Sequence, residues 1–432
     1  MVQKVVIVGA GPSGLLLAHY LARRPNYYIE IYERRSDPRT SQNSRERSFP
    51  ISLQERGRKA IRVIDDLETA IAQQGTFCTA TIMHGEKGKS RKISRPNPLL
   101  TIDRQLLVEI LLQQLEEYAA PERLKIQFEC DCTSLDRTAK TIALQTKNGE
   151  LTANYDVLIG ADGARSQVRQ LLAEANLSSE VSLTPDAYKS VYLDRHQPAL
   201  DRELEPNCLH SWNLGNNSRM ILVPQPGDRL DGVLIFDLAH NPMAGLSTKE
   251  DIIAFFQKHF PILQGLITPK AAEDLLHRPV ARITTVRCDR FHEGDSIGII
   301  GDAAHAVSPA IGQGCNSALE DVSILTRLLD CYHDDWTQVL SQFSQQRIPD
   351  AHALRELADY AFPRTKKLVL EFIIRLKIRR FLHRWFPKLV KPFLFDLFLD
   401  SDLSYSEILR LSRGWIDKVK KATPSSFQAV NS

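Results

Sequence analysis

Three glycines and one glutamate near the start of the chain have the types and the spacing of a site for a large anionic ligand. Gly9, Gly11 and Gly14 follow four β-branched residues, Val5 to Val8, and Glu33 follows a second apolar run. The two apolar runs predict buried strands, and the glycines predict a tight turn that opens a helix. These elements form one βαβ unit.

Each residue of this unit has a separate task in binding a dinucleotide. Gly9 permits the turn, Gly11 lets the backbone approach a pyrophosphate, and Gly14 lets helix and strand pack closely. The helix N-terminus offers free N–H groups to the phosphates, and Glu33 accepts hydrogen bonds from a ribose. The unit therefore predicts dinucleotide binding, and the alternative is a glycine-rich turn without a ligand.

Two further strands end in a carboxylate. Asp162 follows the apolar run that begins at Tyr155, and Asp302 follows the run that begins at Ser296. After Asp302, two glycines precede a long helix that begins near Cys315, so that backbone passes close to a flat group and the helix N-terminus points there. His305 is interpreted as a structural residue at a helix start rather than as a base.

Composition restricts the class of protein. A chain of 432 residues with a net charge of +3 predicts two or three globular domains and gives no sign of a nucleic-acid partner. The seven cysteines are scattered without a CxxC pair, which indicates neither a disulfide framework nor a metal site. The first motif begins so close to Met1 that we expect no signal peptide and a cytoplasmic location.

The coarse element pattern completes the expected fold. We expect one helix from Glu55 to about Ala72, a strand over 76–83, a short strand ending near Arg95, and a helix over 105–118. Strands 124–128 and 141–146 are expected to form a small sheet. Region 188–287 predicts an antiparallel sheet with one helix over 249–258.

The three fingerprints together resemble those of flavoprotein monooxygenases of the para-hydroxybenzoate hydroxylase type. Within that superfamily the sequence is most similar to the kynurenine 3-monooxygenase family, and the resemblance covers nearly the whole chain. The segments that carry it are Arg47-Ser48, Glu55-Arg56-Gly57-Arg58, Pro206-Asn207-Cys208-Leu209-His210, residues 255–261, Arg347-Ile348-Pro349-Asp350 and Arg380-Phe381-Leu382-His383.

The resemblance implies FAD as cofactor and NAD(P)H as a transient co-substrate, because no second GxGxxG is present. In this interpretation Arg104 braces the FAD from the sheet, Asp302 contacts its ribityl or pyrophosphate segment, and the backbone at Cys315 faces the isoalloxazine. The expected cofactor-binding residues are Gly9, Gly11, Ser13, Gly14, Glu33, Arg35, Ser52, Arg104, Cys132, Asp162, Asp302, Pro309, Gly314, Cys315 and Asn316.

The resemblance is weakest where kynurenine hydroxylases hold the amino-acid end of their substrate. The aligned positions depart from the family pattern, so we expect L-kynurenine to be a poor substrate or none. These positions are Thr81, Arg95, Ala361, Arg364 and Leu394.

The region Lys367 to Leu399 places apolar residues at helical spacing among many basic ones, with breaks at Pro387 and Pro392. One interpretation is a helical lid over the substrate mouth, and the other is a basic amphipathic surface that lies on an anionic membrane. No apolar run nears the roughly 20 residues that would span a bilayer.

The expected fold class is α/β, with a Rossmann-like FAD/NAD(P)-binding domain, an inserted antiparallel-sheet substrate domain and a C-terminal helical region. The expected division assigns 1–75, 100–185 and 287–350 to the FAD-binding domain, 76–99 and 186–286 to the substrate domain, 351–421 to a helical lid, and 422–432 to a disordered tail.

The expected activity is hydroxylation of an aromatic or cyclic small molecule with O₂, through a flavin C4a-hydroperoxide. The catalytic residues and the oligomeric state stay open. Two rival interpretations are a dehydrogenase or reductase of the same fold without oxygen insertion, and a non-catalytic flavin-binding protein at a membrane.

Overall fold

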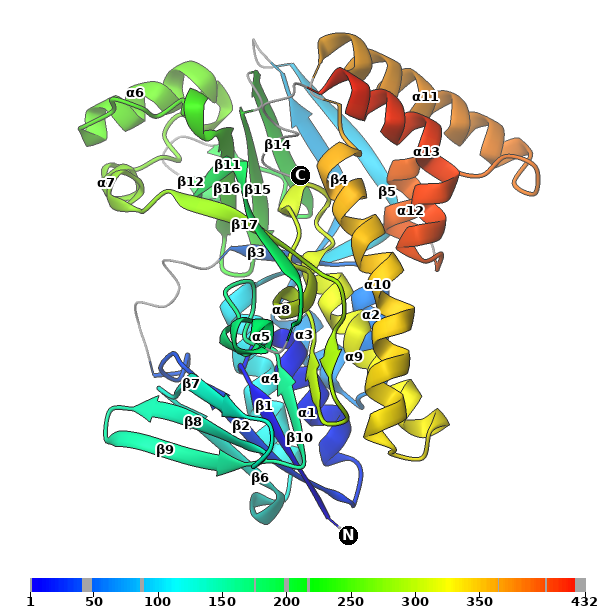
Figure 1. Ribbon diagram of the computed structural model, residues 1–432. Coiled ribbons are helices and arrows are strands. Elements are labelled where there is room, and N and C mark those ends of the chain that lie inside the picture. Colours follow the sequence, from blue (N-terminus) through cyan, green and yellow to red (C-terminus); the bar gives the residue numbers. More distant parts are fainter. Residues whose placement is uncertain are drawn as a thin grey trace.

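The computed structural model describes residues 2–40, 49–85, 89–174, 176–197, 202–215, 218–363, 365–400 and 402–423. Two large sheets lie one above the other in Figure 1, with the amino end below and the C-terminal helices beside the upper sheet. This mixed α/β arrangement confirms the fold class expected from the sequence.

The lower sheet is a six-stranded, mainly parallel sheet in the order β18-β19-β10-β1-β2-β6. Strand β1 lies at its centre between β2 and β10, with Val5 opposite Ile29 on one side and Val157 on the other. All of Val5 to Val8 are buried because both faces of the sheet are covered. The strands are β1 (Gln3–Val8), β2 (Tyr27–Glu33), β6 (Leu124–Phe128), β10 (Val157–Gly160), β18 (His292–Glu293) and β19 (Ile297–Ile299).

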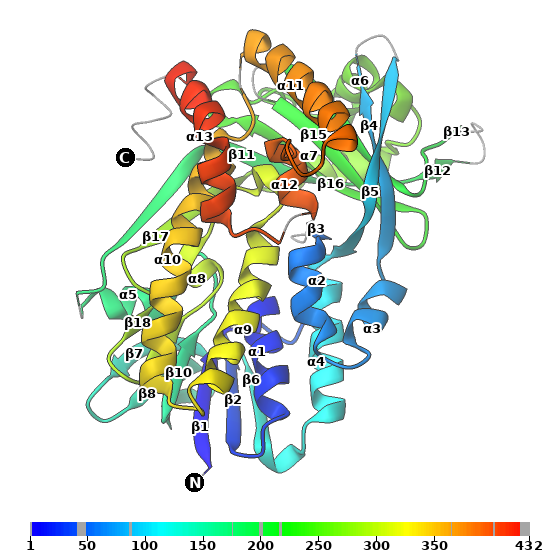
Figure 2. The ribbon, with the colours of Figure 1, turned by 90° about the vertical axis from the view of Figure 1, so that its right-hand side faces the viewer.

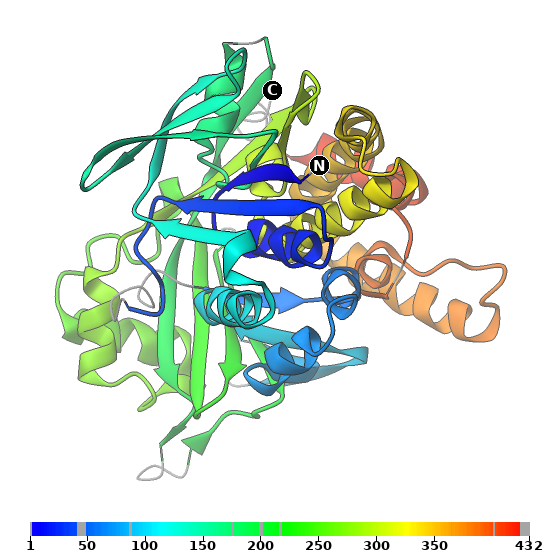
Figure 3. The same cartoon turned by 90° about the horizontal axis from the view of Figure 1, so that it is seen from below.

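Helices cover one face of this sheet and a small antiparallel sheet covers the other, as the view from below shows (Figure 3). Both layers contribute residues to one continuous apolar core with the strands. The helices are α1 (Pro12–Ala22), α4 (Arg104–Tyr118), α8 (Asp302–His305), α9 (Gly314–Cys331) and α10 (Trp336–Tyr360), and α5 (Gln167–Ala173) follows β10. The small sheet contains β7 (Asp131–Asp136), β8 (Thr141–Thr146) and β9 (Gly149–Asn154).

The upper sheet has eight strands in the order β17-β11-β16-β15-β14-β4-β5-β3. All neighbours pair antiparallel except β14 and β4, which are parallel. The strands are β3 (Pro50–Leu53), β4 (Thr76–His84), β5 (Ser90–Asp103), β11 (Ser179–Asp194), β14 (Cys208–Gly215), β15 (Ser218–Gln225), β16 (Arg229–Asp237) and β17 (Ala281–Cys288), and the short β12 (His196–Gln197) and β13 (Arg202–Glu203) pair apart.

Side chains alternate between the two faces of the upper sheet. Leu222 and Phe236 pack into a second apolar core with α6 (Lys249–His259) and α7 (Pro269–His277). Their neighbours Ile221 and Ile235 line a cavity on the opposite face. The strand period of two residues therefore gives this sheet one face for stability and one for a ligand.

The C-terminal helices form a third apolar core with the end of α10, beside the upper sheet. In Figure 2, α11 lies at the end of the molecule farthest from the parallel sheet. The expected helix breaks at Pro387 and Pro392 are confirmed, because no helix covers residues 386–393. The helices are α11 (Lys366–Trp385), α12 (Leu394–Asp400) and α13 (Tyr405–Ala422).

Four local expectations were wrong. The helix expected from Glu55 to Ala72 is two helices, α2 (Glu55–Arg62) and α3 (Leu67–Gln73), because Asp66 adopts a left-handed φ of 60°. The strands at 124–128 and 141–146 do not form a small sheet together. The first, β6, joins the parallel sheet beside β2, and the second, β8, pairs with β7 and β9. The strand expected to end near Arg95 continues to Asp103, and region 188–287 contains two helices rather than one.

Candidate functional site: a cofactor cradle and an adjoining cavity

The glycine loop after β1 has the backbone geometry that its sequence predicts. Gly9 has a φ of +109°, and a Cβ atom there would lie 2.5 Å from the carbonyl oxygen of Ala161. A Cβ on Gly14 would lie 2.2 Å from the carbonyl oxygen of Gly9. Neither position accepts a side chain, so these two glycines fix the turn and the close helix packing.

Gly11 differs from both because its surroundings leave space. The nearest atom to a Cβ built there is the carbonyl oxygen of Ala161, at 3.9 Å. Gly11 has extended backbone at the N-terminus of α1 and lines the cavity. A side chain at Gly11 would thus enter the cavity where the helix N–H groups face an anion, which is how a pyrophosphate cradle is built.

Glu33 is held at the end of β2 by two backbone N–H groups. Ala10 donates to its carboxylate over 3.0 Å, and Arg35 donates over 2.9 Å. The carboxylate therefore braces the glycine loop and still lines the cavity. Arg35 lines the cavity beside it.

A second set of backbone groups comes from the segment after β19. Gly301 has a φ of +60° and donates its N–H to Asp321 Oδ2 over 2.8 Å. Asp302 is exposed to the cavity at the start of α8. Gly314 begins α9, and the nearest atom to a Cβ there is 3.8 Å away, so this helix N-terminus also faces open space.

Asp162 at the end of β10 also lies on the cavity. Its Oδ2 atom accepts from the N–H groups of Gln167 and Val168 and so caps α5. Its Oδ1 atom is buried and has no hydrogen-bond partner among the described residues. Burial raises the pKa of Asp162. A donor on a bound ligand would satisfy Oδ1, so this residue fits the polar part of a dinucleotide.

One cavity of about 2750 Å³ joins these groups. Pockets for a single small molecule are usually about 300–1,000 Å³, so this cavity has space for a dinucleotide and a second ligand. All the expected cofactor-binding residues line it except Gly14 and Asn316. Much of the remaining lining comes from the upper sheet and the C-terminal helices.

Asn316 does not line the cavity, and its side chain makes hydrogen bonds inside the protein instead. It is fully buried, accepts from the Gln54 N–H over 2.7 Å and donates to the Ser52 carbonyl over 2.8 Å. A Cβ on Gly57 would lie 2.6 Å from Asn316 Oδ1, so α2 packs closely against α9. Asn316 therefore fixes β3 to the start of α9.

Sequence reasoning missed the residues that tie the start of α9 to the C-terminal helices. Gln313, the residue before α9, is fully buried and contacts Gln54. Its Oε1 atom accepts from the Tyr405 hydroxyl over 2.9 Å. Gln54, Gln313 and Tyr405 are far apart along the chain, so a single sequence carries no signal that they meet.

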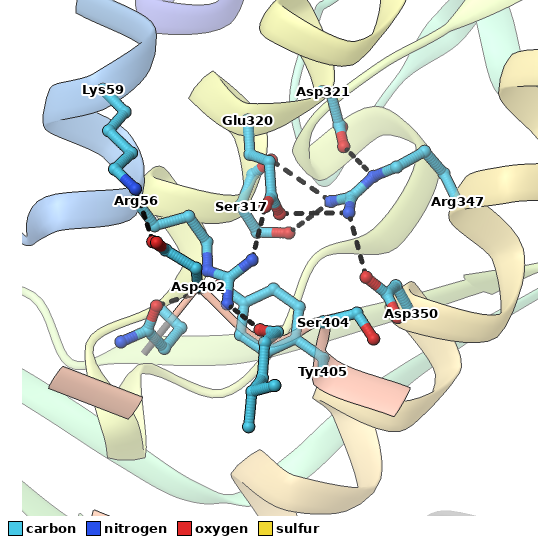
Figure 4. A network of polar contacts seen from close by, with 12 residues as sticks. Arg56, Lys59, Ser317, Glu320, Asp321, Arg347, Asp350, Asp402, Ser404 and Tyr405 are labelled. Carbon is cyan, nitrogen blue, oxygen red and sulfur yellow. Dashed lines mark hydrogen bonds and ion pairs between the residues drawn. The ribbon is translucent and has the colours of Figure 1, made fainter. Parts of the chain in front are cut away.

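A buried charge network extends this connection (Figure 4). Arg347 on α10 donates from Nε to Asp321 Oδ1 over 2.8 Å and from Nη1 to Glu320 Oε2 over 3.0 Å. Arg56 pairs with Glu320 and lies over the Tyr405 ring, 4.2 Å from its centroid. The network links α2, α9, α10 and α13, so it holds the C-terminal helices against the cofactor side.

His305 belongs to the same network. Its Nε2 atom lies 2.6 Å from Asp321 Oδ2, and the ring is buried away from the cavity lining. Burial opposes ionisation of Asp321, but His305 and Arg347 outweigh it and lower the pKa of this carboxyl. This geometry is that of a structural histidine.

The five expected substrate positions are not all at the cavity. Thr81 and Arg95 line it, and Arg95 Nη2 donates to Thr81 Oγ1 over 2.9 Å. Ala361 and Leu394 are buried in the third core and do not line the cavity. Arg364 lies outside the described residues, as do residues 41–48 of the loop after Glu33 and residues 424–432 of the expected tail.

Helix α11 has apolar side chains on two faces. Phe372, Ile373 and Leu376 line the cavity. The outer face carries a series of exposed apolar residues, here called the outer stripe: Leu370, Ile374, Ile378, Phe381, Trp385 and, beyond the helix end, Leu389. Among the described residues, no helix combines the length and apolar character that crossing a bilayer requires.

Comparison with known proteins agrees with this geometry. The family described as FAD binding domain matches residues 2–358. The kynurenine 3-monooxygenase of Sus scrofa is 31% identical over 431 residues, which cover 96% of this chain and 87% of that enzyme.

Solved structures share the fold at lower identity. The tetrameric form of 2-methyl-3-hydroxypyridine-5-carboxylic acid oxygenase has a TM-score of 0.69 at 19% identity, over 83% of this chain and 91% of that one. The CtdE structure in complex with FAD has a TM-score of 0.67 at 15% identity, over 98% of this chain and all of that one (100%).

The fold is that of a flavin-dependent oxidoreductase. The chain belongs to the FAD binding domain family and, within it, to the kynurenine 3-monooxygenase family of flavoprotein monooxygenases. It is an FAD-dependent monooxygenase that uses NAD(P)H, O₂ and a small-molecule substrate.

Proposed function

We propose that this monooxygenase hydroxylates a largely apolar ring compound with at most one acidic group, and that L-kynurenine is not its substrate. The observation that carries the proposal is the wall of the cavity opposite the glycine loop. Most of its lining is apolar, and Arg95 with Thr81 is the polar pair at the expected substrate positions. Charged residues such as Arg91, Asp237, Arg282 and Asp359 also line this wall. Its apolar residues include Leu209, Ile221, Val233, Ile235, Phe362, Phe372, Ile373, Leu376, Phe395 and Phe398.

A zwitterionic substrate needs a partner for each charge. An unpaired buried charge or polar group costs several kcal/mol. Ala361 and Leu394 supply no polar atom from their side chains and are buried in the third core. A ring with a single anionic group, held by Arg95, needs no further charged partner.

The cofactor side follows from the same residues. We propose that the N–H groups of α1 hold the FAD pyrophosphate, that Glu33 binds the adenosine ribose, and that Asp302 contacts the chain between pyrophosphate and ring. When bound and reduced, FAD supplies the chemistry that activates O₂ for insertion into a ring. The N-terminus of α9 at Gly314 and Cys315 would stabilise negative charge on the flavin ring, and the apolar wall would keep water away from it.

The test is a screen of substrate-dependent NAD(P)H oxidation with ¹⁸O₂. We expect ¹⁸O in the product of an apolar aromatic acid or an indole, and H₂O₂ without labelled product for L-kynurenine. Saturable, well-coupled hydroxylation of L-kynurenine at micromolar KM would overturn the proposal.

We also propose that the enzyme binds the surface of an anionic membrane through the outer stripe. Phe381 and Trp385 expose 64% and 66% of their areas, which is costly for large apolar side chains in water. Seven basic residues along the same segment are exposed: Lys367, Arg375, Lys377, Arg379, Arg384, Lys388 and Lys391. Apolar residues that enter the headgroup layer, flanked by cations, match the chemistry of an anionic lipid surface.

Sedimentation with vesicles tests the membrane contact. Wild-type holoenzyme should sediment with phosphatidylcholine vesicles containing about 30% phosphatidylglycerol, less so at high salt, and much less without the anionic lipid. Phe381→Glu/Trp385→Glu should abolish sedimentation, whereas Val63→Glu, a change at a residue 60% exposed on α2, should not. Equal sedimentation of both variants would contradict the proposal.

A further inference from the structure

The cavity reaches the surface at the outer stripe. Leu370 lines the cavity and yet exposes 61% of its area. Lys377 and Arg380, on the same helix, also line the cavity. The mouth of the substrate pocket therefore opens on the face that we propose to rest on the membrane.

Apolar side chains lie on both faces of α11, at the surface and in the cavity. Phe372 is two residues from Leu370 and Ile373 is one residue from Ile374 in sequence, but Phe372 and Ile373 line the cavity. Soluble enzymes with water-borne substrates gain nothing from apolar residues on both sides of such a helix, because exposed apolar area is costly. This arrangement suits a ligand that leaves the apolar interior of a bilayer and enters an apolar pocket.

Cations also lie where the cavity opens at α11, and they could guide an anionic group. Arg380 is paired with Asp396 over 2.6 Å and holds α11 to α12, while Lys377 is exposed. An acidic group on a lipid-dissolved ring would lie at the headgroup level, beside Lys377, while its apolar part lies in the bilayer. Arg95 is one of several cations of the upper sheet that line the same cavity, with Arg91, Arg219 and Arg282.

We infer that the substrate is a membrane-dissolved ring compound with an apolar chain and one acidic group, and that it enters the pocket from the bilayer beneath α11. The inference rests on the proposed function and deepens it by giving the substrate class and its source. It requires no new chemical step, because hydroxylation takes place at the same site.

The route can be tested without turnover by photolabelling the holoenzyme. The probes are a hydroxynaphthoate that carries a diazirine, and the same ring with an added hexadecyl chain. Each is supplied with phosphatidylcholine vesicles containing about 30% phosphatidylglycerol. Mass spectrometry then locates the label at cavity residues such as Phe372 and Leu376, or on the outer stripe.

The wild-type protein should carry label from both probes at cavity residues. Phe381→Glu/Trp385→Glu should lower cavity labelling by the hexadecyl probe about tenfold and leave labelling by the short probe unchanged, because only the first must come from the bilayer. Val63→Glu should behave as wild type with both probes.

The outcomes separate the two proposals. If the short probe labels the cavity but the hexadecyl probe labels only the outer stripe, or if the stripe variant treats both alike, the entry route is wrong and the proposed function stands. If neither probe labels the cavity of the wild-type protein, the substrate class itself is wrong, and the entry route falls with it.

Discussion

The two walls of the cavity differ in the groups that face a ligand. The cofactor wall consists of strand ends, glycines and helix N-termini, in which backbone groups face the ligand and Gly9 and Gly14 admit no side chain. The opposite wall consists of side chains from the upper sheet and from α11 and α12. Backbone geometry tolerates little change, whereas side chains can be exchanged, so we propose that one wall holds the cofactor and the other sets the substrate.

The largest expected effect on cofactor binding comes from blocking the cofactor wall. Gly11→Val should leave the protein folded, because space surrounds this position, but its side chain would fill the place of the pyrophosphate. We expect FAD affinity to fall at least about 100-fold, which is about 3 kcal/mol.

FAD content after gel filtration, read by absorbance, checks this prediction. Gly414→Val, at an exposed helical glycine with no atom near its Cβ, is the control and should retain FAD. A folded Gly11→Val protein with stoichiometric FAD would remove the assignment of the cradle.

The next effect concerns the network that joins the two walls. Arg347→Met should leave Asp321 and Glu320 without their buried partner, and breaking such a pair costs roughly 3–5 kcal/mol. Urea unfolding of the holoenzyme measures this loss. Arg413→Met removes an exposed ion pair with Glu356 and should cost less than about 1 kcal/mol. Equal losses in the two variants would show that the network does not hold the walls together.

A smaller effect is expected from one contact of the cofactor wall. Asp302→Ala should weaken FAD binding about tenfold, because a single polar contact of roughly 1.5 kcal/mol is lost. Activity should return with excess FAD, since Asp302 is proposed to hold the cofactor and not to transfer a proton. Activity that stays lost at saturating FAD would assign it a chemical role instead.

The smallest effect comes from a buried histidine behind the substrate wall and depends on pH. Burial, with a contribution from His210, lowers the pKa of His84 from the ordinary value of 6.5 to about 4. The unfolded chain therefore binds a proton in this range before the folded protein does. Stability should be complete above about pH 6.5 and should fall between pH 6.5 and pH 4, by an amount on the order of 1 kcal/mol for this residue.

The contribution of His84 to stability is tested by measuring the urea midpoint of unfolding across this pH range. His84→Gln should flatten the pH dependence, and His277→Gln, at an exposed position on α7, should not. The His84 and Trp212 rings are stacked, and Trp212 on β14 lines the cavity. A shallower pH dependence is the expected signature, since His19 is also buried with its pKa lowered to about 4. An unchanged slope in His84→Gln would contradict it.

The same difference between the walls explains what could be predicted from sequence. Gly9, Gly11 and Gly14 act through local backbone, so their spacing alone predicted the turn that the structure contains. Asp162 and Asp302 were found because each follows a buried strand, and parallel strands bring their carboxyl ends to one edge of a sheet.

The substrate wall depends on packing between distant segments, which a single sequence does not reveal. Ala361 and Leu394 align with positions that hold the substrate in kynurenine hydroxylases. The packing of α11 to α13 nevertheless places them in the third apolar core. The contact of Tyr405 with Gln313 spans 92 residues and has no motif. The break at Asp66 was missed because a left-handed φ at a non-glycine residue has only a weak sequence signal.

The central claim is that this family member keeps the cofactor wall and has exchanged the substrate wall. The most direct test measures ¹⁸O incorporation from ¹⁸O₂, by mass spectrometry, with L-kynurenine and with the hexadecyl hydroxynaphthoate in anionic vesicles as competing substrates. The account predicts label in the naphthoate product and none in kynurenine. Label in kynurenine alone, with NAD(P)H consumption matched to product, would contradict it.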